Sequence, residues 1–393
     1  MSALAEALED TLPADATGAA LAGRVWLPGE AGPAVIAVRE GALVDLSRSF
    51  PTMRDLCEAA DPAASVRSVP GETIGTLADI LANTPPEQRD AAKPSLLAPI
   101  DLQAIKAAGV TFVTSLLERV IEERARGNPA AAITIRAEVT RLVGGDLARL
   151  RPGSAEATAL KETLIREGVW SQYLEVGIGP DAEIFTKAQP LSAVGTGVEA
   201  GVHPKSFWNN PEPEVVLVIA SSGRTVGAAL GNDVNLRDFE GRSALLLGKA
   251  KDNNASCAIG PFLRFFDARF GMDDVRRMTV SLRVRGSDGF VLEGASSIGE
   301  ISRDPEELVR QLFSPEHQYP DGAALFLGTM FAPVADRGEA GKGFTHRIGD
   351  LVEIETPALG RLVNRIQSAD ACPPWTFGAG ALMRNLARRG LLA

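Results

Sequence analysis

Short apolar runs separated by glycines and turn residues dominate the chain from about residue 180 onward. The runs that predict strands are EVVLVIA, TVGAALGNDVNL, VSLRVRG, GFVLEGASS, AALFLGTM and DLVEIETPALGRLVNRI. Two of them flank Ser-Asp-Gly in RVRGSDGFVLEG, which predicts a β-hairpin. One helix interrupts the strands at DPEELVRQLF, where Asp304 is the expected N-cap. Because helices do not alternate with these strands, we predict a large, mostly antiparallel β domain.

The beginning of the chain has a different pattern. The apolar runs RVWLP, PAVIAV and GALVDL are short and broken by Gly and Pro, which predicts a small β unit. PTMRDLCEAA then predicts a helix that opens with Pro51 and Thr52. A segment with several prolines around residues 84–95 predicts a linker. We therefore expect a small N-terminal domain over residues 1–95 and a larger domain over residues 96–393.

Between these two β regions, apolar residues recur at helical spacing. TFVTSLLERVIEERARG has this period and ends in Gly127, a residue type that commonly follows a helix. AAAITIRAEVTRLVGGD and SAEATALKETLIREGVW share the pattern. The sequence thus indicates an α+β protein that is mostly β.

Composition is that of an ordinary globular protein: 393 residues, 45% hydrophobic and 23% charged, with a net charge of −10. The negative charge argues against nucleic acid and against an anionic membrane surface as partners, because both attract clustered Lys and Arg. We see no signal peptide and no apolar stretch of the ~20 residues that a spanning helix needs. The cysteines, Cys57, Cys257 and Cys372, are odd in number and far apart, so no disulfide framework follows. We expect a reduced, cytoplasmic enzyme.

Two glutamates stand where a strand is about to enter the core. Glu212 and Glu214 flank Pro213, directly before the apolar run VVLVI. Residues i and i+2 of a strand face the same side, roughly 6.6–6.8 Å apart along the chain, so both carboxylates can converge on one cation. Pro213 cannot donate to a sheet, which marks a strand start, an edge or a bulge. From this stretch alone, a solvated strand end is an equally good interpretation.

Two segments downstream favour the cation. GNDVNLRDFEG contains Asp233, Arg237 and Glu240, and LGKAKDNNASCAIGPF contains Lys251. Carboxylate oxygens are the ligands that Mg²⁺, Mn²⁺ and Ca²⁺ prefer, and three of them leave room for water or a substrate. A nearby lysine could balance the excess negative charge or hold a substrate oxygen.

The order of these segments resembles the fumarylacetoacetate hydrolase superfamily. The matching elements are Glu212-x-Glu214, Asn232-Asp233 with Arg237-Asp238, Lys251 with Gly260-Pro261, Gly328-Thr329, Gly349-Asp350, and the Phe-x-Lys segment of EIFTKAQ. The resemblance extends over roughly residues 96–393. It implies a rolled mixed β-sheet around a metal site, and a homodimer or higher homo-oligomer.

The resemblance also implies the ligands. Glu212, Glu214 and Asp233 are the expected ligands of Mg²⁺, with Mn²⁺ as a possible substitute. Lys251 is expected beside the metal, in contact with the substrate or a metal-bound water.

Other residues are expected to contact the substrate. Arg237 and Thr329 match positions that line the substrate site in this family, and Glu240 stands where members often have Gln. Lys187 is either a substrate-site residue or a lysine at the edge of the core. His203 is either at the mouth of the site or, as the more favoured alternative, in a turn or on the surface before Pro204.

One family element is altered. Hydrolases of the family carry Asn-Tyr-x-x-His-x-x-Glu, in which His and Glu activate the attacking water. In VTFVTSLLER, Phe112 falls at the Tyr position, Ser115 at the His position and Glu118 at the Glu position. A serine cannot take a proton from water without a base of its own. The hydrolytic pair is therefore broken, while the carboxylate remains.

The family also contains lyases that dehydrate 2-keto-3-deoxy sugar acids, and the segment GVEAGVHPKSFWNNPEPEVV and the long N-terminal section resemble the pentonate dehydratases. We expect Mg²⁺-dependent removal of water from a 2-keto-3-deoxy pentonate, derived from D-xylonate or L-arabinonate, to give 2-oxoglutarate semialdehyde. Glu118 is the candidate for proton transfer, and Lys251 is the alternative. A C–C hydrolase or decarboxylase of an acylpyruvate or diketo acid stays open. So does a metal-stabilised β-roll that binds a keto acid or a partner protein without catalysis.

Overall fold

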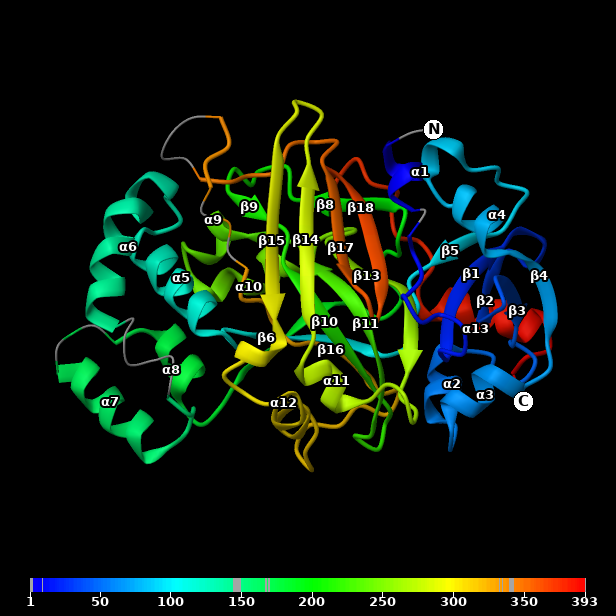
Figure 1. Ribbon diagram of the computed structural model, residues 1–393, viewed down its shortest axis with the longest axis horizontal. Coiled ribbons are helices and arrows are strands. Elements are labelled where there is room, and N and C mark those ends of the chain that lie inside the picture. Colours follow the sequence, from blue (N-terminus) through cyan, green and yellow to red (C-terminus); the bar gives the residue numbers. More distant parts are fainter. Residues whose placement is uncertain are drawn as a thin grey trace.

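The computed structural model describes residues 3–8, 10–143, 150–166, 168, 170–331, 333, 335–338 and 343–392. A group of helices lies at one end and the N-terminal strands at the other, with the remaining strands of the two large sheets between them (Figure 1). That helical group comprises α5 (Val113–Arg124), α6 (Pro129–Val143), α7 (Ala155–Arg166) and α8 (Gln172–Ile178). Both ends of the chain lie on the side of the N-terminal strands (Figure 1).

The larger sheet has eleven strands within the residues that the structure describes. In spatial order they are β4 (Glu72–Thr76), β3 (Ala42–Asp45), β2 (Gly32–Arg39), β1 (Leu21–Leu27), β13 (Cys257–Phe265), β11 (Thr225–Asp233), β10 (Pro213–Ile219), β16 (Ala323–Phe326), β6 (Ala104–Gly109) and β7 (Glu183–Ala188), and β5 (Ser95–Leu97) pairs with β1. Strands β16 and β6 run parallel, whereas the other pairs of this sheet are antiparallel.

The second sheet has five strands. Its order is β15 (Val291–Ser297), β14 (Thr279–Arg285), β17 (Leu351–Thr356), β18 (Gly360–Ser368) and β8 (Val198–Val202), with β18 and β8 parallel. The predicted hairpin is confirmed: β14 and β15 are antiparallel neighbours that join at Arg285 and Val291. A two-stranded sheet of β9 (Asn209–Asn210) and β12 (Asn235–Leu236) lies apart from both.

The predicted fold class, α+β and mostly β, is confirmed. The two large sheets mix parallel and antiparallel pairs, and neither closes into a barrel over the strands that the structure describes.

Strand β10 is buried on both faces, which explains its unbroken apolar run. Val215, Leu217 and Ile219 pack in a cluster with residues of β14 and β17 from the second sheet. Val216 and Val218 belong to a different cluster, with residues of the N-terminal section. Strand β14 instead alternates exposed and buried residues, because only one face of the second sheet meets the core.

The remaining helices cover the sheets. They are α1 (Ala3–Ala7), α2 (Met53–Glu58), α3 (Pro62–Ser68), α4 (Leu77–Ala82), α9 (Arg237–Glu240), α10 (Leu247–Lys251), α11 (Met272–Arg276), α12 (Pro305–Leu312) and α13 (Ala379–Arg388). Two predicted helix starts are confirmed. Thr52 caps α2 through a capping box with Asp55, and the Asp304 carboxylate accepts from the Glu306 N–H at the start of α12.

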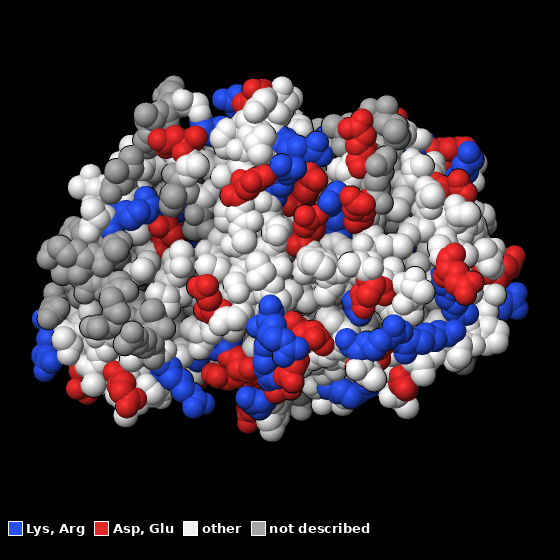
Figure 2. Space-filling model, viewed as in Figure 1, with Lys and Arg blue, Asp and Glu red and all other residues white. Residues whose placement is uncertain are grey.

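The N-terminal strands continue the larger sheet, because β1 pairs with β13 through Leu21–Arg264 and Ala22–Leu263. The division into domains at residue 95 stays a prediction. None of the helices in the described part of the chain is long and apolar enough to cross a membrane. On the face shown in Figure 2, basic and acidic side chains are intermingled.

Candidate metal-dependent active site

Antiparallel pairing of β10 with β11 brings the predicted ligands together. Glu214 lies opposite Gly231, and the Asp233 N–H donates to the Glu212 carbonyl oxygen over 3.1 Å. One carboxylate oxygen from each of Glu212, Glu214 and Asp233 lies within 4.8 Å of the other two, and all three residues are buried. A set of three converging oxygen donors fits Mg²⁺ or Mn²⁺ and leaves positions for water or a ligand. These three residues could therefore hold a metal ion.

The three carboxylates differ in their electrostatic balance. Burial raises the pKa of Glu214 well above its usual value, and the neighbouring Asp233 and Glu212 raise it further. A backbone N–H, that of Gly328, donates to Glu214 over 2.6 Å. Burial would also raise the pKa of Asp233, but Lys187 and Lys251 more than offset it and lower that pKa. The cluster thus carries repulsion that a bound cation would relieve.

Two lysines supply the positive charge at this end of the sheet. Lys251, the last residue of α10, places its Nζ 2.7 Å from a Glu212 oxygen, 3.1 Å from Asp233 and 3.4 Å from Glu240. Lys187, on β7, lies 3.0 Å from Asp233 and donates to the Lys251 carbonyl oxygen over 2.6 Å. Lys187 is fully buried and is not among the residues that line the cavity, so it supports Asp233 and α10 from behind.

The carboxylates face a small cavity of about 40 Å³. Its lining residues are Ala108, Gly109, Val110, Ser115, Arg119, Tyr173, Glu183, Phe185, Glu212, Glu214, Asp233, Glu240, Ala244, Leu247, Lys251, Gly328 and Thr329. Of the predicted site residues other than the ligands, Ser115, Glu240, Lys251 and Thr329 therefore lie here. The cavity has room for about one or two waters, so a larger ligand requires its walls to move apart.

Arg119 was missed by the sequence reasoning, although it lies on the same helix as Ser115 and one turn further along. Its guanidinium ion-pairs with Glu122 at 2.8 Å, with Glu212 at 3.0 Å and with Glu240. Arg119 thereby links the helix α5 to the ligand Glu212 and to the short helix α9. The four-residue spacing from Ser115 was the signal that could have identified it.

Glu183 was also missed as a site residue. It opens β7, pairs with Gly109 across the sheet, and places a carboxylate oxygen where a side chain on Gly109 would stand, 2.0 Å from the Cβ position. Its carboxylate makes no hydrogen bond or ion pair with the residues that the structure describes. Burial, then Glu240, raises the pKa of Glu183 to about 7. Its place two residues before Phe185 in EIFTKAQ was the available signal.

Glu118 and Arg237 are placed differently from the prediction. The Glu118 carboxylate accepts from Arg136 over 2.5 Å and 2.9 Å, and from Arg237 over 2.8 Å. Arg237 also donates to Glu122 over 2.6 Å and to the Pro333 carbonyl oxygen over 3.0 Å. Neither residue lines the cavity. This placement does not support Glu118 in proton transfer or Arg237 in substrate binding, because their polar atoms are engaged with each other.

Two other predicted residues, Ser115 and His203, make local contacts. The Ser115 hydroxyl donates to the Phe112 carbonyl oxygen over 2.9 Å, a local helix contact. His203 lies outside the cavity lining and packs on Phe239 with ring centroids 5.0 Å apart. The turn alternative for His203 agrees with its Nδ1, which accepts from the Lys205 N–H over 3.1 Å.

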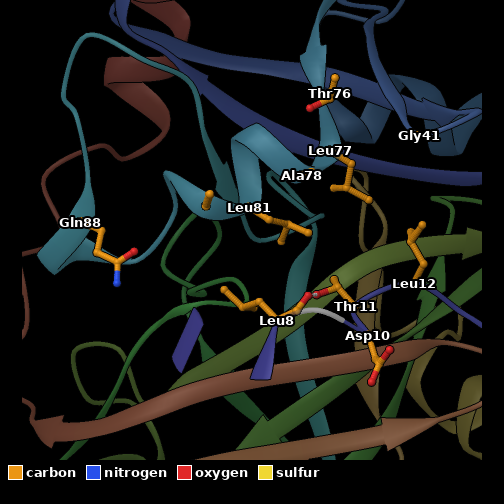
Figure 3. A pocket seen from close by; sticks show the side chains of 11 residues that line it. Leu8, Asp10, Thr11, Leu12, Gly41, Thr76, Leu77, Ala78, Leu81 and Gln88 are labelled. Carbon is orange, nitrogen blue, oxygen red and sulfur yellow. Dashed lines mark hydrogen bonds between the residues drawn. The ribbon is translucent and has the colours of Figure 1, made fainter. Parts of the chain in front are cut away.

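A larger cavity of about 700 Å³ lies elsewhere, between the N-terminal segment and α4. Figure 3 shows that leucines, among them Leu8, Leu12, Leu77 and Leu81, form much of its wall. Among the described residues that line it, Asp10 is the sole titratable group. The grouping of acids and bases that could perform chemistry is therefore in the smaller cavity.

Fold and site together define a class of protein: a mostly-β scaffold with a buried carboxylate centre that could hold a divalent metal ion. Residues 179–367 match the family described as fumarylacetoacetate (FAA) hydrolase C-terminal. Over these residues the chain is similar to the fumarylacetoacetate hydrolase family, as the motif order predicted.

Two curated relatives match the chain in sequence. One is 2-dehydro-3-deoxy-D-arabinonate dehydratase of Saccharolobus solfataricus, 30% identical over 185 residues, 47% of this chain and 58% of the relative. The other is a probable 2-keto-3-deoxyxylonate dehydratase of Haloferax volcanii, 30% identical over 194 residues, 49% of this chain and 63% of the relative. The matched part thus spans less than two thirds of either relative.

Solved structures extend the likeness over most of the chain. A 2-keto-3-deoxy-D-arabinonate dehydratase in its apo form has a TM-score of 0.61 at 20% identity and covers 88% of this chain and 99% of its own. A dehydratase of that name complexed with magnesium and 2,5-dioxopentanoate has a TM-score of 0.60 at 20% identity over the same shares. At this identity the likeness establishes the fold.

Proposed function

We propose that the protein is a metal-dependent hydro-lyase that removes water from a 2-keto-3-deoxy pentonate to give 2-oxoglutarate semialdehyde. The observation that carries the proposal is the meeting of three candidate metal ligands, the cation Lys251 and the acid Glu183 in one small cavity. The names of the two curated relatives support the substrate class. Both D-xylonate-derived and L-arabinonate-derived substrates fit this proposal.

Glu212, Glu214 and Asp233 would hold Mg²⁺, or Mn²⁺ in its place. When bound, the ion supplies a Lewis acid for the carboxylate and keto oxygen of a 2-keto acid, which makes the C3 protons more acidic. Lys251 adds a fixed positive charge 2.7 Å from Glu212, at the edge of the ligand set. Thr329 lines the same cavity, and the Gly328 N–H donates to Glu214.

We assign proton transfer to Glu183 in place of Glu118, with Lys251 as the alternative. As a carboxylate, Glu183 accepts a proton from C3 and passes it to the C4 hydroxyl group, which leaves as water. The C3–C4 double bond that results shifts to C4–C5 when a proton moves from C5 to C3. The enol formed in this way becomes the semialdehyde when its hydroxyl proton moves from the C5 oxygen to C4. Glu183 suits this role because no described cation pairs with it and it faces the cavity.

Elimination is favoured over hydrolysis by the absence of a histidine from the cavity lining, as far as the structure describes it. Ser115 stands where hydrolases of the family place that histidine, and its hydroxyl already donates to a backbone carbonyl. Hydrolysis in this family uses a histidine together with a carboxylate to activate water. Elimination needs only one acid–base group, the role that we assign to Glu183.

The test is incubation with 2-keto-3-deoxy-D-xylonate, its L-arabinonate counterpart and acetylpyruvate, each with Mg²⁺, followed by identification of the products. We expect semialdehyde from a deoxy-pentonate. Rapid release of pyruvate from acetylpyruvate, with no semialdehyde, would replace the proposal with the hydrolase alternative. No turnover of any of them, with Mg²⁺ bound, would favour the non-catalytic alternative.

Assembly as a homodimer or higher homo-oligomer and a cytoplasmic location remain parts of this proposal. Light scattering coupled to size-exclusion chromatography measures the first. Fractionation of cells that express the full chain measures the second.

A further inference from the structure

Beyond the three candidate ligands, the cavity wall contains two more acids, Glu183 and Glu240. Glu240 is 4% exposed, and its Oε1 atom makes no hydrogen bond within the described part of the chain. Its nearest cation, Lys251, is 3.4 Å away from that oxygen. Glu240 lines the cavity, and buried acceptors normally have a donor, so an oxygen held only by an ion pair at 3.4 Å calls for a hydrogen-bond donor from a ligand.

The cations of the cavity are already engaged. Arg119 pairs with Glu122, Glu212 and Glu240. Lys251 pairs with Glu212, Asp233 and Glu240. A ligand that brought an additional carboxylate to this wall would therefore meet two acids and find neither cation free to receive it.

We propose that Glu183 and Glu240 restrict the site to 2-keto acids with a single carboxylate and a hydroxylated tail. This inference rests on the proposed function, because the metal centre must receive the 2-keto carboxylate. Hydroxyl groups of the tail donate hydrogen bonds to Glu240 Oε1 and to the Glu183 carboxylate. A second carboxylate is rejected, because it can only accept hydrogen bonds and repels both acids.

The charges of the cavity agree with this restriction. Five carboxylates line it, from Glu183, Glu212, Glu214, Asp233 and Glu240, against the cations of Arg119 and Lys251, with Lys187 behind Asp233. A divalent ion brings these charges close to balance. One ligand carboxylate can bind that ion directly, whereas a second adds negative charge that nothing in the wall compensates.

Calorimetric binding to the Mg²⁺-loaded protein tests the inference without turnover. The probes are 5-hydroxy-2-oxopentanoate, 2-oxopentanoate and 2-oxoglutarate, which share a five-carbon chain and differ in the group at C5. We expect the hydroxy acid to bind best and 2-oxoglutarate at least tenfold more weakly than it. In Glu240→Gln this ratio should fall at least tenfold.

Asp252→Asn is the matched control. Asp252 follows Lys251 in the chain but is exposed, and it accepts from the Gln189 side chain over 3.0 Å. The substitution Asp252→Asn removes one negative charge outside the cavity, so the ratio of the two binding affinities, hydroxy acid to 2-oxoglutarate, should stay as in the wild type. If Glu240→Gln melts at a lower temperature than the wild type, Glu183→Gln serves as the second test variant. Its substitution breaks no ion pair, because the Glu183 carboxylate has none with the described residues.

Equal binding of the hydroxy acid and 2-oxoglutarate to the wild type would overturn the restriction and leave the proposed function standing. An unchanged ratio in both variants would overturn the roles of Glu183 and Glu240. If none of the three keto acids binds to the Mg²⁺-loaded protein, the proposed function itself is wrong, and the restriction falls with it.

Discussion

At the scale of single residues, Glu214 is the most sensitive probe of the metal centre. Burial and the two neighbouring carboxylates make its negative charge unfavourable unless a cation is bound. Glu214→Gln should therefore raise the melting temperature in EDTA, remove the stabilisation that Mg²⁺ gives, and abolish activity. Glu212→Gln and Asp233→Asn should abolish activity as well. Full activity of any of these variants at low Mg²⁺ would remove that residue from the ligand set.

Glu183 and Glu118 provide a contrasting pair. Glu183→Gln should lower kcat by roughly the 10²–10⁴-fold of a lost acid–base group. Glu118→Gln should act chiefly on stability, because Glu118 accepts from Arg136 and Arg237 outside the cavity. Steady-state kinetics and thermal melts of both variants separate the two roles. A larger loss of kcat in Glu118→Gln than in Glu183→Gln would return the assignment to Glu118.

The pH dependence of activity follows from the same residue. Burial and Glu240 raise the pKa of Glu183 to about 7, and the proposed role needs its ionised form. Activity should therefore fall as the pH drops through this pKa and be complete above it. A bound cation favours the carboxylate and moves the limb to lower pH. In Glu183→Gln the fall of kcat/KM at low pH should disappear. If the fall persists in this variant, it belongs to the titration of another group.

At the scale of elements, Arg237 joins three parts of the chain. It contacts Glu118 and Glu122 of α5, donates to Pro333 in the loop after β16, and stacks on Trp208 with 4.3 Å to the ring centroid. Arg237→Met leaves buried acids without this partner and should lower the free energy of unfolding by about 3–5 kcal/mol. Arg136→Met, whose side chain is 31% exposed, should cost much less. Denaturant unfolding compares the two, and equal losses would contradict the bridging role.

The turn after β16 depends on a glycine. Gly328 has φ +86°, and a Cβ there would lie 2.1 Å from the Thr111 hydroxyl oxygen and 2.9 Å from the Ala108 carbonyl oxygen. Gly328→Ala should therefore displace the N–H that donates to Glu214 and weaken Mg²⁺ binding. Gly349 also has a positive φ, +92°, but no atom of the described residues lies near the position of an added Cβ. Gly349→Ala is therefore the control that introduces backbone strain without a steric clash. Mg²⁺ titration of both variants is the measurement, and equal affinities would show that the contact is unimportant.

At the scale of the whole molecule, metal binding should be coupled to folding stability. A ligand at 100 times its dissociation constant stabilises the folded state by about 2.7 kcal/mol. EDTA should therefore inactivate the protein and lower its melting temperature, and Mg²⁺ or Mn²⁺ should restore both. Zn²⁺ should restore them poorly, because the three candidate ligands are all carboxylates. Activity that survives exhaustive chelation would contradict the metal-dependent mechanism.

Much of the molecule is determined by local sequence. The double-sided burial of β10, the hairpin of β14 and β15, and the caps at Thr52 and Asp304 all follow from patterns of a few residues. The convergence of Glu212, Glu214 and Asp233 was predictable too. Glu212 directly precedes β10 and Glu214 lies within it, and Asp233 matches a family motif.

What the tertiary structure alone decided is which polar side chains face the cavity. Glu118 and Arg119 are neighbours on α5, yet Arg119 reaches Glu212 while Glu118 is held by Arg136 and Arg237. One residue of offset turns a helical side chain by about 100°, and only the packing of α5 against the sheets determines which direction points inward. Glu183 likewise became a site residue through its pairing with Gly109, 74 positions away in sequence. The candidate ligands and the fold class could be predicted from the sequence, because both depend on local spacing, whereas the proposed proton-transfer and specificity residues depend on long-range packing.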